Sequence, residues 1–170
     1  MNLPVKFAYA VIIFATFFMA GCAAPTKTAN LNSPEIPPWH GRLAVRVEAD
    51  LPQSPSQSFS AGFELSGNPS AGELTLYTPL GTTAATLTWT PQTAALRANG
   101  DIRYFESLAA LIKQAVGTEI PVAALFAWLA GDNMVAAGWS ADLSQQTNGK
   151  ITARRMEPAP QAELRLMLEK

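Results

Sequence analysis

Alternation of apolar and polar residues dominates the chain from Gly41 onward. In the first such segment Leu43, Val45 and Val47 are separated by Ala44, Arg46 and Glu48. A period of two describes a strand with one buried and one solvated face, as in antiparallel sheets. The same pattern predicts strands over residues 43–48, 58–65, 73–77, 85–90, 135–143, 150–156 and 164–168. Asn148-Gly149 is interpreted as a type I′ hairpin turn before the strand that begins at Lys150.

A helical period appears only between residues 108 and 131. One apolar face is formed by Leu108, Leu111, Ile112, Ala115 and Val116, and Gly117 is placed to end that helix. A second helix opens with Pro121 in its first turn, buries Val122, Leu125, Phe126 and Leu129, and ends at Gly131. We therefore predict a mainly β fold with two short helices. Strand twist would allow the sheet to curve into an open or partly closed barrel that encloses an apolar space.

The amino terminus has the features of a secretory leader. Residues 7–19 are almost entirely apolar and follow a single Lys6. Thirteen residues suit a signal peptide better than a transmembrane helix, which needs roughly 20. Met19-Ala20-Gly21-Cys22 resembles the bacterial lipobox, in which the cysteine thiol takes a diacylglyceryl group. We predict a signal peptide over 1–21 and lipid modification of Cys22; the alternative is an uncleaved anchor helix with an incidental cysteine.

The segment after the cysteine predicts how the protein is attached. Residues 24–38 are rich in Pro, Thr, Asn and Ser, which favours a tether over 22–38 and leaves a folded domain over 39–170. Two or more acyl chains make membrane anchoring stable. Ala23 stands where an aspartate would mark retention, so resemblance to the sorting rule of enteric bacteria favours the outer membrane.

Composition and charge exclude several functional classes. The chain has 170 residues, a formal net charge of −1 and one cysteine, so an intramolecular disulfide is impossible. It lacks the basic stripe of a nucleic-acid binder. The only histidine, His40, lies at the tether boundary, and neither a phosphate-binding glycine loop nor a nucleophile motif is present. We expect no enzymatic activity, no metal and no cofactor.

Large aromatic residues are the remaining candidates for function. The predicted domain holds Trp39, Trp89, Trp128 and Trp139, together with Phe59, Phe63, Phe105 and Phe126. These side chains either fill a core or line a ligand cavity. Their number, and the small Ala and Gly residues beside many of them, favour a cavity without deciding between the two.

Four motifs carry a family resemblance. They are Gly41-Arg42-Leu43-Ala44-Val45, Tyr77-Thr78-Pro79-Leu80-Gly81, Ile120-Pro121-Val122 with Trp128-Leu129-Ala130-Gly131, and Gly138-Trp139. In this order and spacing the sequence resembles the LolB family over nearly all of residues 39–168. Members of that family are outer-membrane lipoproteins that accept other lipoproteins from a periplasmic carrier.

The resemblance implies a fold and a site. The expected fold is an incomplete antiparallel β-barrel, covered by helices around an apolar cavity that receives acyl chains. We expect its lining among Phe63, Leu76, Leu87, Trp89, Leu111, Leu125, Trp128 and Trp139. The family also implies that Leu80, between Pro79 and Gly81, protrudes into solvent and helps to deliver cargo to the membrane. Pro and Gly are independently placed for a tight turn there; the alternative is a leucine folded back onto a neighbouring loop.

These observations together predict a monomeric receptor and chaperone for lipoprotein localisation. It would be anchored by lipid on Cys22 to the periplasmic face of the outer membrane, take lipoproteins from the carrier and insert them into that membrane. The alternative is a structural or assembly lipoprotein whose β-domain binds a protein or glycan and has no lipid cavity.

Overall fold

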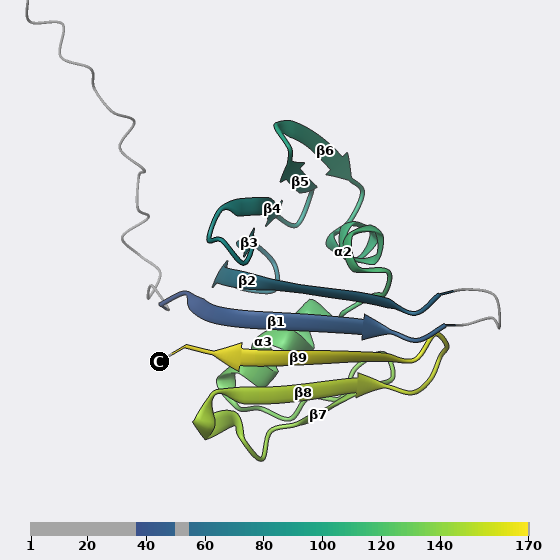
Figure 1. Ribbon diagram of the computed structural model, residues 1–170. Helices are drawn as coiled ribbons and strands as arrows, with labels where there is room; N and C mark the ends of the chain where they lie inside the picture. The colour runs from purple at the N-terminus through teal and green to yellow at the C-terminus, as the bar shows by residue number, and fades with distance from the viewer. Residues whose placement is uncertain (1–36, 50–54, 170) are drawn as a thin grey trace, which may run out of the picture. The chain divides into compact units, whose positions relative to one another are not determined.

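A computed structural model describes residues 37–49 and 55–169 as one antiparallel sheet and two short helices (Figure 1). The strands of the described residues are β1 (Trp39–Val47), β2 (Gln57–Gly67), β3 (Gly72–Tyr77), β4 (Thr83–Trp89), β5 (Ala94–Ala98), β6 (Asp101–Phe105), β7 (Trp139–Asp142), β8 (Lys150–Arg155) and β9 (Ala162–Leu168). The helices are α2 (Leu108–Val116) and α3 (Val122–Ala130), and a 3₁₀ turn, η1, covers Gln146–Asn148. The predicted signal peptide and most of the predicted tether lie outside the described residues.

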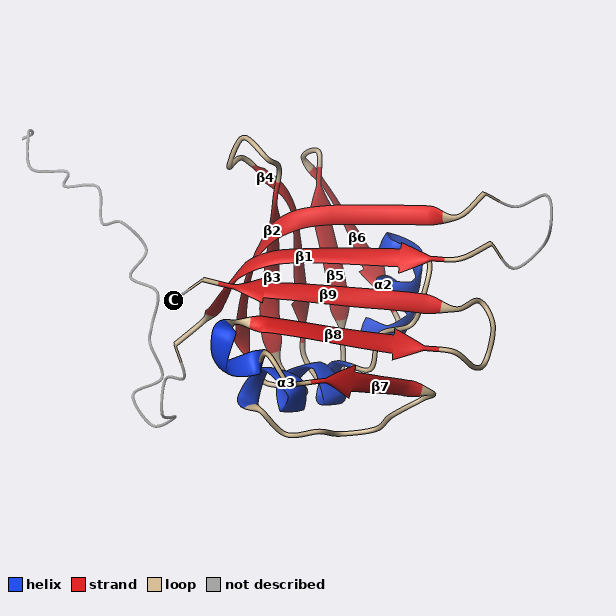
Figure 2. Cartoon of the chain, turned by 60° about the horizontal axis from the view of Figure 1, so that its bottom comes forward, coloured by secondary structure: helices blue, strands red, loops and turns tan. Residues whose placement is uncertain are grey.

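The sheet grows in two directions from its first strand. Its order is β6-β5-β4-β3-β2-β1-β9-β8-β7, so the last strand of the chain returns to pair with the first. The edge strands β6 and β7 do not pair with each other, and the curved sheet therefore stays open (Figure 2). The chain passes from β6 to β7 through α2 and α3, and residues of both helices pack against the apolar core of the sheet. The prediction of a mainly β, unclosed antiparallel sheet with two short helices is confirmed.

Strand register brings the predicted apolar faces together. Val45 of β1 lies between Phe59 of β2 and Leu164 of β9. Leu76 of β3 lies between Phe63 of β2 and Ala85 of β4. Directly opposed residues point to the same face of a sheet. One continuous apolar surface therefore covers the inner side of the central strands.

The two helices begin and end where their sequences predict. The Ser107 hydroxyl accepts a hydrogen bond from the backbone N–H of Ala110 at 3.1 Å, which caps the first turn of α2. Gly117 and Gly131 follow the two helices with φ values of 79° and 94°. Only glycine adopts this left-handed conformation without strain, so both helices stop there.

The interpretation of Asn148-Gly149 as a two-residue hairpin turn was wrong. Those residues end the η1 turn within the longer connection between β7 and β8. The two-residue turn instead falls at Asn99-Gly100, where φ is 53° and 86°. It joins β5 and β6, two strands that the alternation pattern did not predict. A type I′ turn needs positive φ at both central residues. Asn99 and Gly100 meet this requirement between two paired strands, whereas Asn148 does not have a positive φ.

The strand predicted over residues 135–143 is shorter than expected. β7 covers only Trp139–Asp142, and Val135 is 72% exposed. Ala137 and Gly138 both have positive φ, 51° and 78°, which interrupts extended backbone just before the strand. A Cβ at Gly138 would collide with the carbonyl oxygen of Glu157. The backbones of the two segments are thus too close for a larger residue there.

Candidate functional site

An apolar cavity lies between the inner face of the sheet and the helices. Its wall consists only of hydrophobic side chains, supplied by five strands, both helices and the segment between them. They are Leu43, Val45, Phe59, Leu74, Leu76, Leu87, Ile112, Ala115, Val116, Ile120, Leu125, Leu164 and Leu166. A space with this lining offers no hydrogen-bonding group to a ligand. It therefore suits a hydrocarbon chain and excludes a polar substrate.

The cavity is small in the conformation described. Its volume is about 70 Å³, which is room for only a few water molecules. Pockets that hold drug-sized ligands usually measure about 300–1,000 Å³. An acyl chain would therefore need the helices and the sheet to separate. The cavity residues Ile112 and Val116 of α2 are only half-buried, whereas Leu111 on the same helix is fully buried.

Three of the eight residues predicted to line the cavity belong to its wall, and five do not. Leu76, Leu87 and Leu125 belong to the cavity wall. The other five, which are Phe63, Trp89, Leu111, Trp128 and Trp139, are buried in the surrounding core and are not part of that wall. Most of the wall consists of smaller aliphatic residues. In the sequence, those on the strands can be recognised as the apolar positions of the alternating pattern, as at Leu43 and Val45.

Hydrogen bonds explain why the tryptophans lie beside the cavity and not in its wall. The indole N–H of Trp128 donates to the carbonyl oxygen of Met134 at 2.7 Å, and that of Trp139 to Glu119 at 3.0 Å. The indole of Trp89 likewise donates to the carbonyl oxygen of Asn68 at 3.1 Å. A buried indole needs such a partner. These rings are therefore fixed where loops supply free carbonyl groups.

The turn between β3 and β4 holds Leu80 in solvent. The Gly81 N–H donates to the Thr78 carbonyl at 2.9 Å, and the Thr78 N–H donates to the Thr82 carbonyl at 2.9 Å. The hydroxyl groups of Thr78 and Thr82 lie 2.8 Å apart and close the base of the turn. Leu80 at its tip is 92% exposed. The hydrogen bonds of the turn therefore keep this leucine away from the core.

A bulge lies at the base of this turn, on β4. The pairing of β3 with β4 shifts after Leu76, so that Leu76 lies opposite Ala85 while Tyr77 lies opposite Thr83, which leaves Ala84 without a partner. A bulge bends the strand and redirects the following residues. It therefore bends β4 where this strand leaves the turn.

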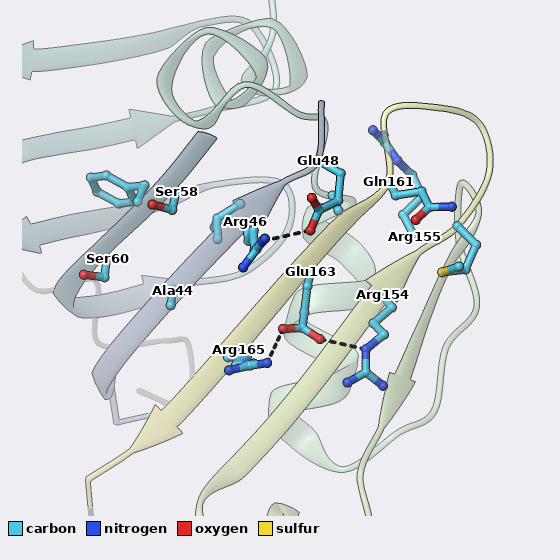
Figure 3. A pocket seen from close by; sticks show the side chains of 14 residues that line it. Ala44, Arg46, Glu48, Ser58, Ser60, Arg154, Arg155, Gln161, Glu163 and Arg165 are labelled. Carbon is cyan, nitrogen blue, oxygen red and sulfur yellow. Dashed lines mark hydrogen bonds and ion pairs between the residues drawn. The ribbon is translucent and has the colours of Figure 1, made fainter. Parts of the chain in front are cut away.

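The outer face of the sheet carries charge instead of hydrocarbon. On β8 and β9, Glu163 accepts from Arg154 at 2.7 Å and pairs with Arg165 at 2.6 Å (Figure 3). Burial raises the pKa of the Glu163 carboxyl, but the hydrogen bond from Arg154 and the charges of both arginines outweigh it. The net result is a pKa below the ordinary value of 4.5.

Neither a metal-ligand cluster nor a membrane-spanning helix occurs within residues 37–49 and 55–169. No group of three or more His, Cys, Asp or Glu side chains converges there. None of the helices in those ranges is long and apolar enough to cross a bilayer. His40 is exposed at the start of β1, and Cys22 lies outside the described residues.

Fold and site together define a class of protein: a half-open, barrel-like antiparallel sheet that encloses an all-apolar cavity. The chain belongs to the family described as outer membrane lipoprotein LolB, whose model matches residues 38–162. The predicted family, its non-enzymatic nature and the outer-membrane location are thereby confirmed.

Individual relatives agree with the family assignment. The chain is 30% identical to the outer-membrane lipoprotein LolB of Bordetella pertussis, over 97% of this chain and 94% of the relative. It is 29% identical to the protein of the same name from Bordetella parapertussis, with the same coverage. The identity to that of Shewanella loihica is 30%, over 77% of this chain and 61% of the relative. The match thus spans less than two thirds of the Shewanella protein and nearly all of the Bordetella proteins.

Proposed function

We propose that the chain accepts lipoproteins from a soluble periplasmic carrier, holds their acyl chains in the interior cavity and inserts them into the outer membrane. The observation that carries this proposal is the cavity wall, in which all 13 side chains are hydrophobic. The protein acts as a monomer anchored by lipid on Cys22. Its partners are the carrier, the cargo lipoproteins and the membrane.

Uptake requires the interior to widen. The cavity wall includes Ile112, Ala115 and Val116, all on α2. This helix has nine residues, and short helices depend on tertiary packing for their stability. Displacement of α2 from the sheet would join the cavity to solvent on that side. The acyl chain would then replace the contacts that α2 makes with the strands.

The energetics favour direct hand-over. Burial of ten methylene groups is worth about 8 kcal/mol at about 0.8 kcal/mol each. Release of such a chain into water would be slowed by a comparable barrier. Cargo therefore passes from the carrier cavity to this cavity, and then to the bilayer, without crossing water. A solvent-exposed Leu80 close to the bilayer would assist the last step, because an apolar tip can enter the lipid layer.

Anchoring is tested at Cys22. The Cys22→Ser substitution removes the thiol that would accept the diacylglyceryl group. We expect this variant to lose label from a palmitate analogue in growing cells and to leave the membrane fraction. Label that persists on the variant would contradict lipid attachment at this position.

Uptake is tested on the α2 side of the cavity. Ala115 is exposed yet belongs to the cavity wall, so Ala115→Trp should place an indole against that side of the cavity with little loss of stability. Ala109 is exposed on the same helix and lies outside the wall, so Ala109→Trp is the matched control. Each variant is anchored in vesicles and offered a labelled lipoprotein on the carrier.

We expect Ala115→Trp to slow cargo uptake at least tenfold and Ala109→Trp to leave the rate unchanged. Equal uptake by both variants, with both folded by thermal unfolding, would contradict acyl binding in this cavity. It would favour a structural lipoprotein that binds a protein or glycan through another surface.

A further inference from the structure

The outer face of three adjacent strands concentrates positive charge. The outward side chains of β1, β9 and β8 include five cations, namely Arg42, Arg46, Lys150, Arg154 and Arg165, and one carboxylate, Glu163. We call this surface the basic face. The described residues as a whole carry nine Lys and Arg side chains against 11 Asp and Glu. The domain is therefore polarised, with its positive side on these strands.

The cations of the basic face are paired with carboxylates at one end only. At one end Arg46 pairs with Glu48 at 2.8 Å, and Glu163 pairs with both Arg154 and Arg165 (Figure 3). At the other end Arg42 and Lys150 form no ion pair with any carboxylate in residues 37–49 or 55–169. The cations available to a partner are therefore at this second end.

An exposed apolar residue lies between the two unpaired cations. Met167 of β9 is directly opposite Arg42 on one side and Lys150 on the other, and it is 55% exposed. The three side chains form a row of cation, thioether and cation across β1, β9 and β8. This combination suits the boundary between the phosphate groups and the hydrocarbon of a lipid bilayer. The two cations would contact phosphate groups, and the Met167 side chain would contact hydrocarbon.

The same end carries the Leu80 turn. A hollow of about 540 Å³ is lined by Arg42 and Met167 from the basic face and by Pro79 and Gly81 from the turn. Glu64 and Glu169 also line this hollow. The turn and two members of the row, Arg42 and Met167, thus border one depression, and Leu80 projects from the turn at its rim.

The chain also enters the domain at this hollow. His40, in the second position of β1, contributes to its lining. An anchor on Cys22 therefore joins the domain at the end that bears the unpaired cations and Leu80.

We infer that Arg42, Met167 and Lys150, together with the Leu80 turn, form the surface that rests on the membrane, where the two cations bind phosphates of anionic phospholipid headgroups. The inference rests on the proposed function, to which it adds the orientation of the domain during delivery. Leu80 and Met167 are separate apolar points among charges. The centre of a protein interface is more apolar than this and depleted in charge, whereas a fluid headgroup layer accepts isolated apolar side chains among cations.

The test measures which face of the anchored protein meets the bilayer. Because Cys22 carries lipid, Met167→Cys supplies the only free thiol, and an environment-sensitive dye is attached there. The full lipoprotein is reconstituted in phosphatidylethanolamine vesicles with and without phosphatidylglycerol. We expect blue-shifted emission that increases with the anionic lipid and weakens in high salt. The control dye is placed by Tyr104→Cys on β6, a residue that is 76% exposed, and we expect no shift there.

Cation substitutions make the test specific. A lysine or arginine near an anionic surface contributes about fivefold to binding, so Arg42→Gln with Lys150→Gln should lower the equilibrium constant for membrane contact about 25-fold. Arg97→Gln with Arg103→Gln removes two exposed cations from β5 and β6 and should have no effect. Equal effects of the two pairs, or equal shifts at positions 104 and 167, would overturn the inference.

Two further outcomes separate this inference from the proposed function. Cargo transfer from the carrier is followed in the same vesicles. If the dye at position 167 is shielded only when the carrier is present, the basic face is a protein-docking surface and the inference is wrong. If the dye responds to anionic lipid as expected but no cargo is accepted, the membrane orientation stands and the proposed function is overturned.

Discussion

The inner and outer faces of this sheet are built from the same strands and have opposite chemistry. Val45 and Leu164 point inward and are almost completely buried, whereas the adjacent Arg46 and Glu163 point outward and form ion pairs. The inner face has no polar group in its cavity wall, and the outer face has little hydrocarbon. The clearest exception on the outside is Leu80. The contrast teaches that the most exposed large apolar side chain of the described residues is held in solvent by a hydrogen-bonded turn.

Packing explains why the apolar residues of the inner face are buried, and local hydrogen bonds explain why Leu80 is exposed. Leu76 and Leu80 are the same residue type, four positions apart, with exposed fractions of 6% and 92%. Leu76 lies on β3 with strands on both sides, and Leu80 lies beyond the bulge on a turn closed by Thr78 and Thr82. This pair of leucines allows each side of the comparison to be tested with identical chemistry.

The largest expected effect is on the inner face. We expect Leu76→Ala to lower the free energy of unfolding by about 2–5 kcal/mol, because it removes buried methyl groups and enlarges the cavity. Leu80→Ala should change it by less than about 0.5 kcal/mol. Urea denaturation of both variants measures the difference. Similar losses in the two variants would show that Leu80 belongs to the core.

A smaller effect is expected at the turn. Gly81 has φ of 80°, and a Cβ there would meet no atom within 4 Å. Gly81→Ala should therefore destabilise the protein only through backbone strain, by about 1–2 kcal/mol. We also expect it to slow delivery, because relief of the strain would redirect Leu80. An unchanged unfolding free energy would indicate that the turn is not held in this conformation.

The smallest expected effect is electrostatic and lies on the outer face. The pKa of Glu163 is lower in the folded protein than its ordinary value of 4.5, so the folded state favours the ionised form. Its contribution is present above that ordinary value and is lost as the pH falls through the lower, folded pKa. Two surface ion pairs contribute at most about 1 kcal/mol each.

Thermal unfolding between pH 7 and pH 3 measures this contribution. We expect wild type to lose more stability than Glu163→Gln as the pH falls, because the variant has no carboxylate to protonate. Parallel curves for the two proteins would exclude the predicted role of Glu163.

Much of the fold follows from strand alternation and helix punctuation. Strands with a clear apolar face, such as those around Val45 and Leu164, were predicted to within a few residues, and Gly117 and Gly131 marked both helix ends. β5 and β6 were missed for a physical reason. The segment Ala94–Ala98 is mostly alanine, and all of β6 except Phe105 is exposed, so neither strand shows a strong apolar period.

The site was less accessible to sequence reasoning than the fold. Trp128 and Trp139 were predicted to line the cavity, but an indole is directed by its N–H group toward a free carbonyl. The cavity wall consists mainly of aliphatic residues whose proximity depends on three-dimensional closure by α2. Leu80 was easier to place, because Pro79 and Gly81 define its turn locally.

Delivery by Leu80→Glu is the measurement that tests the central claim most directly. Wild type and the variant are anchored in liposomes, loaded with a labelled lipoprotein from the carrier, and followed for insertion of that cargo into the bilayer. The account predicts normal thermal stability and normal uptake with insertion slowed at least tenfold, because a charge at the tip opposes contact with lipid. A stable variant that inserts cargo at the wild-type rate would contradict it.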